Sequence, residues 1–427
     1  MIIPFPYNWC PDLQIDDRLI QGIYAPKEVC LGLEQQQRII KIAMDNPIGT
    51  PRLSEMAKGK RRLVIITDDN TRNTPIPLLL SAVLDELSIA GISDDQVGIV
   101  IAYGTHRAMT TEEKRIKLGD DVVDRFRIVD HDSRDKSSMT SVGHTDTGID
   151  ILISSEVINA DLVIALGHIV PHRVAGWSGG GKAIQPGVSG EDITGHTHWA
   201  SSFFDSREIL GVADNPVRRE VERVASVAGL GFILNVIMAA VDQIAACVAG
   251  DPVLAHRAGS VIGRQILGVK IPREADVVIC DSYPADLDFW QANKALFAAD
   301  IAARQGGAVI LITPCPEGVS SRHPQLLDYG YMSFAEVQSL VEAGALTDLT
   351  LAANLSGVGR VVAEHVTCIV VSPWLRAVEC EKLGMRHADT PQEALQMALD
   401  IVRRGGGHNN PIVSVLRRAP EILPLIG

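Results

Sequence analysis

Short runs of β-branched residues alternate with amphipathic helical patterns along the first part of the chain. The run Arg61-Arg-Leu-Val-Ile-Ile-Thr-Asp-Asp is typical of a buried parallel strand, and similar runs return over 96–102, 126–129 and 162–166. Thr74 and Pro75 predict the start of an intervening helix that stops near Gly91. This alternation predicts a doubly wound parallel sheet, in which ligands bind beyond the carboxyl ends of the strands.

The same alternation restarts after a linker-like stretch, Gly268-Val-Lys-Ile-Pro-Arg-Glu. Strands are expected over 275–280, 308–313 and 366–371, and helices over 289–303, 334–342, 348–362 and 391–404. We therefore expect two α/β domains with largely parallel sheets and an active site in the cleft between them. The N-terminal cofactor-binding domain is expected over 1–268 and the C-terminal domain over 269–427, with a tail free to pack back on the first domain.

Composition narrows the classes of function. The net charge of -13 opposes binding to nucleic acid or to an anionic membrane, so a small-molecule substrate fits better. The seven cysteines include no C-x-x-C pair, which favours reduced thiols in a cytosol. The start of the chain lacks a basic region followed by a long apolar stretch. These features predict a cytoplasmic enzyme or binding protein.

The segment from His168 to Trp199 places four histidines and one lysine around three consecutive glycines. Such a glycine run usually occurs where another group must approach the backbone closely. Histidine suits proton transfer near pH 7 and binding of a borderline metal. The residues are His168, His172, His196, His198 and Lys182. The segment is therefore the first candidate for a reaction centre.

Three polar clusters follow expected strand ends and should meet at one edge of the sheet: 68–72, 103–107 and 167–182. Within them, His106 and His172 could face opposite sides of one substrate and supply an acid and a base. Arg72 could fork onto a carboxylate or phosphate with Asp69 fixing its direction, or form a surface ion pair.

Several patterns keep two interpretations. Gly176-Trp-Ser-Gly-Gly-Gly-Lys resembles a P-loop, but Ala183 stands where a Ser or Thr would ligate magnesium; phosphate binding by backbone amides remains open. His196 and His198 would share a face if extended, as in a paired metal site, or would simply pack. Gln291 and Lys294 share a helix face that could equally be plain surface.

Together these residues resemble the nickel-pincer-dependent lactate racemase family. The resemblance rests on Asp69-x-x-Arg72, Gly104-Thr-His106-Arg, His168-x-x-Pro-His172-Arg-x-Ala-Gly-x-Ser-Gly-Gly-x-Lys182, Thr197-His198-Trp and Gln291-x-x-Lys294, which occur in the expected order. It implies a nickel ion in a pincer mononucleotide derived from nicotinic acid, a pyridinium with two sulfur donors, joined covalently to a lysine.

The resemblance also implies a role for each matching residue. Lys182 would be the tether, His198 the protein ligand to nickel, and His106 and His172 the catalytic acid and base. The remaining residues would hold cofactor and substrate: Ser178, Gly179, Gly180 and Asp69 on the cofactor side, Arg72 on both, and Gln291, Lys294 and Trp290 on the substrate side.

The implied reaction is racemisation or epimerisation of a 2-hydroxy acid by proton-coupled hydride transfer, through a 2-keto acid. Trp290 stands where lactate-specific members commonly carry a phenol, so larger 2-hydroxy acids are also open. Cofactor-maturation enzymes are the implied partners. Two alternatives are a metal-dependent hydrolase using His196 and His198, and a protein that binds a phosphate ligand without chemistry.

Overall fold

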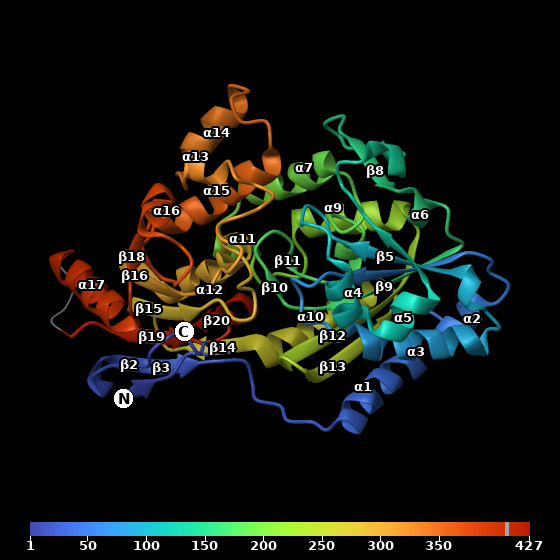
Figure 1. Cartoon of the computed structure of the whole chain (residues 1–427), viewed down its shortest axis with the longest axis horizontal. Helices are drawn as coiled ribbons and strands as arrows, with labels where there is room; N and C mark the ends of the chain where they lie inside the picture. Colours follow the sequence, from blue (N-terminus) through green and yellow to red (C-terminus); the bar gives the residue numbers. More distant parts are fainter. Residues whose placement is uncertain (406–409) are drawn as a thin grey trace. The chain divides into compact units, whose positions relative to one another are not determined.

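The computed structural model describes residues 1–405 and 410–427 (Figure 1). The chain divides into two compact units, one made of Lys27–Ala200 and Gly211–Ile266 and the other of Met1–Pro26, Ser201–Leu210 and Leu267–Gly427. Both units are α/β with largely parallel sheets, which confirms the predicted fold class. The N-terminal 26 residues lie in the same unit as 267–427, whereas the expected boundary assigned them to the first domain.

The unit that carries residues 27–200 is built on a six-stranded sheet in the order β13-β12-β9-β4-β5-β6. Every pairing is parallel except that of β12 with β13. All seven residues of β9 are buried, as expected for a strand covered on both faces. The strands are β4 (Leu63–Asp68), β5 (Val97–Ala102), β6 (Arg127–Asp130), β9 (Leu162–His168), β12 (Leu230–Ala240) and β13 (Gln243–Gly250).

Helices and two small hairpins complete this unit. The hairpins are β7 (Met139–His144) with β8 (Asp150–Ser154), and β10 (Pro171–His172) with β11 (Gly176–Trp177). The helices are α1 (Leu33–Asp45), α2 (Leu53–Ala57), α3 (Ile76–Ile89), α4 (Thr111–Leu118), α5 (Asp120–Arg125), α6 (Ser155–Ile158), α7 (Glu191–Ser201), α9 (Pro216–Val227) and α10 (Leu254–Leu267). Short 3-10 turns are η2 (Asp94–Gln96), η3 (Lys136–Ser138) and η4 (Gly180–Ala183).

The other unit holds a six-stranded, fully parallel sheet in the order β18-β17-β16-β15-β19-β3. In Figure 1 the blue strand β3, from the start of the chain, runs beside the red strand β19 from its end. The strands are β3 (Ile20–Tyr24), β15 (Ala275–Asp281), β16 (Ala303–Ile312), β17 (Thr367–Val371), β18 (Arg386–Ala388) and β19 (Val413–Leu416). Two smaller pairings are β1 (Ile2–Ile3) with β2 (Leu13–Gln14), and β14 (Gly268–Ile271) with β20 (Leu423–Ile426). The C-terminal tail thus pairs within its own unit.

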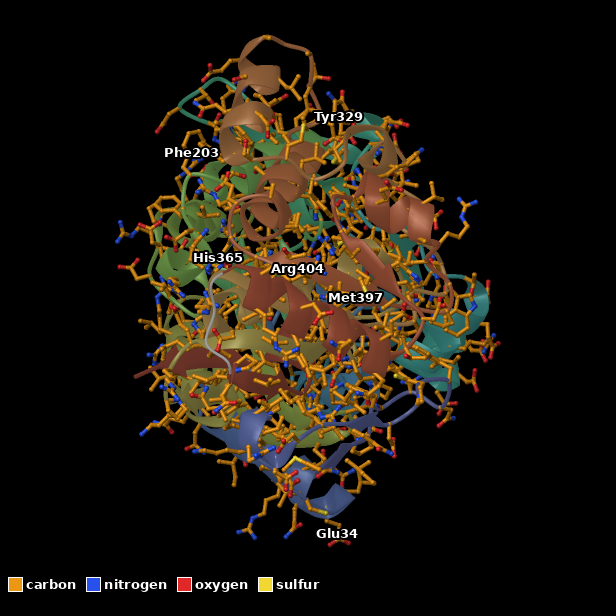
Figure 2. All side chains as sticks on the ribbon, turned by 90° about the vertical axis from the view of Figure 1, so that its left-hand side faces the viewer. Glu34, Phe203, Tyr329, His365, Met397 and Arg404 are labelled. Atoms are coloured by element: carbon orange, nitrogen blue, oxygen red, sulfur yellow. The ribbon has the colours of Figure 1, made fainter. Side chains whose placement is uncertain are left out.

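Helix α17 (Pro391–Arg404) packs on this parallel sheet through its apolar side; Met397 and Arg404 mark it in Figure 2. The expected helix over 289–303 is two helices in the structure, divided at Asn293. The remaining helices are α8 (Ser206–Ile209), α11 (Phe289–Ala292), α12 (Lys294–Ala302), α13 (Leu326–Tyr329), α14 (Phe334–Glu342), α15 (Leu349–Val362) and α16 (Ala377–Lys382), with η1 (Asp17–Leu19) and η5 (Ala419–Glu421). Within the described residues, no helix has the length and apolar character needed to span a membrane.

Candidate active site

The carboxyl ends of β9, β4 and β5 lie side by side because these three strands are neighbours and parallel. Asp68 ends β4, His168 ends β9, and the loop to His106 begins one residue after β5. The polar clusters therefore gather at one edge of the sheet, as the strand pattern predicts.

His106 is held by a buried carboxylate. Its Nδ1 lies 2.7 Å from Asp69 Oδ2, while Asp69 Oδ1 accepts bonds from the Thr71 amide at 3.1 Å and the Thr71 hydroxyl at 2.6 Å. Burial acts to raise the pKa of Asp69, but His106, Thr71 and Arg72 outweigh it and hold that pKa well below its usual range. A carboxylate at Nδ1 selects the Nδ1–H form of a neutral imidazole, so Nε2 is the nitrogen that accepts a proton.

A second buried network fixes the turn after β4. The Thr74 hydroxyl donates its proton to Asp68. His168 Nδ1 lies 2.7 Å from the same hydroxyl oxygen, Thr74 Oγ1. Lys117 of α4 pairs with Asp68 at 2.9 Å and donates to the Arg72 carbonyl at 2.7 Å. His168 is thus engaged in the support of the turn that carries Asp69 and Arg72.

His172 lies in the β10–β11 hairpin, and its neutral ring carries its proton on the other nitrogen from that of His106. The Val174 backbone N–H donates to His172 Nδ1 at 3.1 Å, so a neutral ring carries its proton on Nε2. His106 therefore offers a proton acceptor and His172 a hydrogen-bond donor. A neutral imidazole N–H can polarise an oxygen on which charge develops.

Lys182 lies in η4 and is half-buried. Burial, reinforced by the positive charges of Arg218 and Arg72, places the pKa of this lysine well below its usual value. A desolvated lysine beside other cations loses its proton more readily than an ordinary lysine, and the neutral amine is the nucleophilic form. This environment suits the covalent attachment of an electrophilic group.

The glycines before Lys182 make room for protein atoms. A Cβ on Gly179 would lie 2.7 Å from Asn235 Oδ1, on Gly180 3.0 Å from the His256 ring, and on Gly181 3.0 Å from Ala225 Cβ. Ser178 Oγ donates to the His168 carbonyl at 2.6 Å and accepts from the Val170 amide at 2.9 Å. These four residues thus build the loop itself, and their contact with a cofactor stays a prediction.

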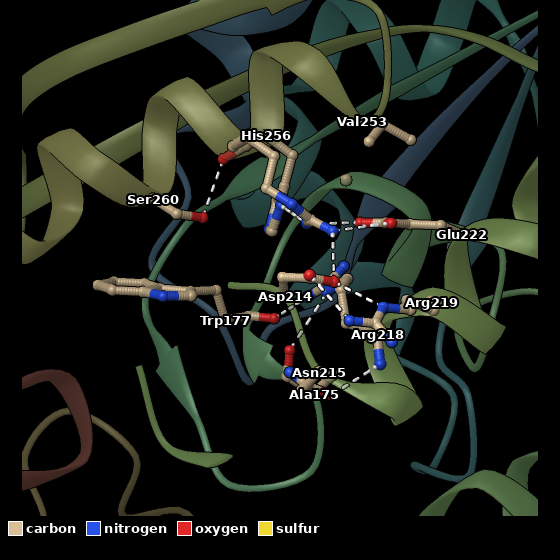
Figure 3. Close-up of polar contacts among 12 residues, drawn as sticks. Ala175, Trp177, Asp214, Asn215, Arg218, Arg219, Glu222, Val253, His256 and Ser260 are labelled. Atoms are coloured by element: carbon tan, nitrogen blue, oxygen red, sulfur yellow. Dashed lines mark hydrogen bonds and ion pairs between the residues drawn. The ribbon is translucent and has the colours of Figure 1, made fainter. Parts of the chain in front are cut away.

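Arg218 on α9, which sequence reasoning missed, holds this loop (Figure 3). Its fully buried guanidinium donates to the carbonyls of Ala175 and Gly179, each at 3.2 Å, and to that of Trp177. His256 on α10 donates to the Ser178 carbonyl at 2.9 Å, and Asn235 accepts from the Gly180 amide at 2.8 Å. The sequence signal for this support of the loop was the polar Asn235 inside the apolar run of β12.

His198 lies in α7 and its Nδ1 donates to the Thr194 carbonyl at 2.8 Å. This bond assigns Nε2 as the nitrogen that can bind a metal, the arrangement usual for histidine ligands. His196 is two positions away in a helix, about 200° around the axis, so the two imidazoles do not share a face. No group of three or more candidate metal ligands occurs among residues 1–405 and 410–427.

Gln291 and Lys294 lie in the unit that contains the C-terminus, and Lys294 Nζ donates to Gln291 Oε1 across the junction of α11 and α12. The backbone N–H of Gln291 donates to Asp288 Oδ1 at 2.9 Å. Trp290 stacks on His323, with ring centroids 4.1 Å apart and planes 13° from parallel. Gln291 and Lys294, which were expected to share a helix face, are therefore in contact across the junction of two helices.

These features define a two-domain α/β enzyme with a histidine–aspartate pair and a lysine of lowered pKa at one sheet edge. Residues 10–211 match the family model of the lactate racemase N-terminal domain, and residues 271–415 match that of the lactate racemase C-terminal domain. The chain belongs to the lactate racemase family, and it is therefore an isomerase.

Comparisons with individual relatives support the same family. The chain is 35% identical over 308 residues to the lactate racemase of Thermoanaerobacterium thermosaccharolyticum, covering 71% of this chain and 72% of that one. It is 33% identical over 288 residues to the lactate racemase of Lactiplantibacillus plantarum, covering 66% and 67%. The lactate racemase apoprotein structure from T. thermosaccharolyticum matches with a TM-score of 0.87 and 30% identity over 100% of both chains. A Thermotoga maritima protein shares the fold, with a TM-score of 0.75 and 18% identity over 92% and 98%.

Gly180→Ala tests the packing of the glycine loop. Gly180 has a φ of +59°, and the added Cβ would press on the His256 ring. We expect a loss of about 2–4 kcal/mol in the free energy of unfolding, measured by denaturant titration. Gly59→Ala is the matched control, because Gly59 has a φ of +73° with open space around it. Equal losses in the two variants would contradict the contact with His256.

Proposed function

We propose that this enzyme racemises or epimerises a 2-hydroxy acid, such as lactate or a larger analogue, with a nickel-pincer mononucleotide bound covalently to Lys182. The observation that carries the proposal is that His106, oriented by Asp69, and Lys182, whose pKa is lowered by burial, belong to the same sheet edge. The names of the relatives support a substrate of this class.

The donor set of this unit fits such a cofactor. The lowered pKa of Lys182 favours the neutral amine that can form the covalent bond, and His198 has its Nδ1 anchored so that Nε2 suits a metal. The lack of other ligand groups among the described residues agrees with a metal whose remaining donors belong to the cofactor. When bound, the nickel pincer supplies a site that accepts the C2 hydride and returns it.

The chain's own residues move the proton and orient the substrate. His106 Nε2 removes the hydroxyl proton as the C2–H bond breaks, leaving a planar 2-keto acid. His172 Nε2–H would donate a hydrogen bond to the substrate oxygen from its own side, and a doubly protonated His172 would return one proton to that oxygen and end as a neutral ring. Arg72, Gln291 and Lys294 hold the carboxylate. Rotation of the keto acid before the hydride returns gives the other enantiomer.

The hydrolase alternative receives no support from the helix geometry of His196 and His198. A protein that only binds a phosphate ligand gives no reason to bury Asp69 against His106. We further propose that the enzyme acts in the cytoplasm, where cofactor-maturation enzymes load it; its seven cysteines are free thiols in the structure.

Mass spectrometry and metal analysis test the cofactor assignment. Protein made alongside the maturation enzymes is expected to carry an adduct on Lys182 and about one nickel per chain. Lys182→Ala should lose both, whereas His198→Ala should keep the adduct with little nickel, because the covalent bond and the metal bond involve different residues.

His196→Ala is the matched control on the same helix and should keep both adduct and nickel. Absence of both an adduct on Lys182 and nickel in the parent protein would contradict the proposed cofactor. Zinc binding that survives Lys182→Ala and is lost in His196→Ala would favour the hydrolase instead.

Asp69→Asn tests the orientation of His106. Loss of the carboxylate removes the selection of the Nδ1–H form, and kcat/KM should fall by roughly 10²- to 10⁴-fold. Because two enantiomers have equal free energies, the fall must be the same in both directions, which polarimetry from each pure enantiomer checks. Asp161→Asn is the control: Asp161 accepts the Arg61 and Arg62 amides at the opposite end of the sheet. A parent-like rate in Asp69→Asn would contradict the role of Asp69.

Trp290→Tyr tests substrate choice. Restoring a phenol should raise kcat/KM for lactate relative to a bulky 2-hydroxy acid by about ten-fold, because the resemblance links a phenol at this position to lactate-specific members and its hydroxyl can hydrogen-bond a polar group of the substrate. The measurement is a rate comparison on the two substrates with loaded enzyme. Trp374→Tyr is the control, because Trp374 is a half-exposed tryptophan of the same unit that packs on Trp9. An unchanged preference in Trp290→Tyr would remove Trp290 from the substrate site.

A further inference from the structure

Arg218 is a buried cation without a carboxylate partner. Its side chain is fully buried, and it forms no ion pair among residues 1–405 and 410–427. Burial lowers the pKa of Arg218 to about 9, which leaves it charged at neutral pH. A buried charge is unfavourable unless it is paired or hydrogen-bonded, and here three backbone carbonyls accept its hydrogen bonds.

One carbonyl joins this arginine to the lysine. The Gly179 carbonyl accepts from Arg218 Nη1 at 3.2 Å and from the Lys182 backbone N–H at 3.3 Å. Arg218 also holds the carbonyls of Ala175 and Trp177, so its planar fork fixes the loop from the hairpin to the turn of Lys182. Figure 3 shows Ala175 and Trp177 around the guanidinium.

The charged groups near η4 have a net positive charge at Lys182. This turn packs against α9, β9, β12 and β4. Arg218 and Arg72 both act on the Lys182 amine, whereas Asp68 of β4 is paired with Lys117. Further groups on these elements are engaged elsewhere: His168 with Thr74, and Glu222 of α9 with Arg257 at 2.6 Å.

We propose that Arg218 is a positioning residue for Lys182: its fork fixes the loop that carries the lysine, and its charge keeps the amine neutral and nucleophilic. The use of this nucleophile for cofactor attachment rests on the proposed function, but the reactivity belongs to the chain alone. On attack, the nitrogen lone pair forms a bond to an acyl carbon, the leaving group departs with its bonding electrons, and the nitrogen releases a proton to water.

Competitive labelling of the apoprotein with acetic anhydride tests this role. The extent of N-acetylation at Lys182, read by peptide mass spectrometry from about pH 6 to about pH 11, gives the midpoint at which the amine becomes neutral. A midpoint does not depend on how easily the reagent reaches the half-buried amine. The exposed Lys58 in the same unit is the internal reference. In the parent protein, Lys182 should become reactive at a clearly lower pH than Lys58.

Two substitutions separate charge from packing. Arg218→Gln keeps hydrogen-bond donors for the loop and Arg218→Met does not, but both remove the charge and should lower the neutral fraction of Lys182 at pH 7 by about ten-fold or more. Arg219→Met is the matched control, because Arg219 is an exposed neighbour on α9 that pairs with Asp214 at 2.8 Å. An unchanged Lys182 midpoint in folded Arg218→Gln and Arg218→Met, or a parent Lys182 that titrates with Lys58, would overturn the proposal.

Glu222→Gln provides a test if Arg218→Met does not fold. Glu222 offsets the positive charge at Arg218, so its neutralisation should lower the Lys182 midpoint further. An unchanged or raised midpoint in a folded Glu222→Gln variant counts against the charge effect. An enzyme that carries the cofactor but shows an ordinary Lys182 midpoint would reject this inference and leave the racemase assignment standing.

Discussion

The parallel pairing of β9, β4 and β5 is the constraint on which the site depends. Because three adjacent strands run in the same direction, chain segments around residues 69, 106 and 168 emerge at the same edge although they are far apart in sequence. The strands are buried on both faces, so a shift in register would expose apolar side chains as well as misplace the loops. Precision at the histidines is therefore a consequence of core packing.

The loop that carries Lys182 obeys a different constraint. Its three consecutive glycines have no side chains to pack, and side chains of α9, α10 and β12 hold its backbone by hydrogen bonds. Replacing a buried charge by apolar groups is often neutral or stabilising in proteins, so stability alone does not explain Arg218. A role in holding and activating Lys182 explains why a cation rather than a neutral donor stands there.

Much of the fold could be predicted because its signals are local. The helix Phe334–Glu342 has the predicted bounds, and Thr390 with Pro391 marks the start of α17 as expected. The division at Asn293 and the pairing of β3 with β19 depend on tertiary packing, which no local pattern encodes. Catalytic side chains could be proposed from motif spacing.

The side chains that hold the loop could not be predicted, since Arg218 and His256 lie on ordinary helices and act through backbone carbonyls.

His106 and His172 also differ in a way that motif spacing does not reveal. His106 is fixed by a carboxylate and His172 by a backbone N–H, so their neutral rings carry protons on different nitrogens. A racemase needs equal kcat/KM in both directions, but this equality follows from the equal free energies of the enantiomers and requires no symmetry in the protein. The chain can therefore orient one histidine with a carboxylate and the other with a backbone N–H, and still catalyse the reaction in both directions.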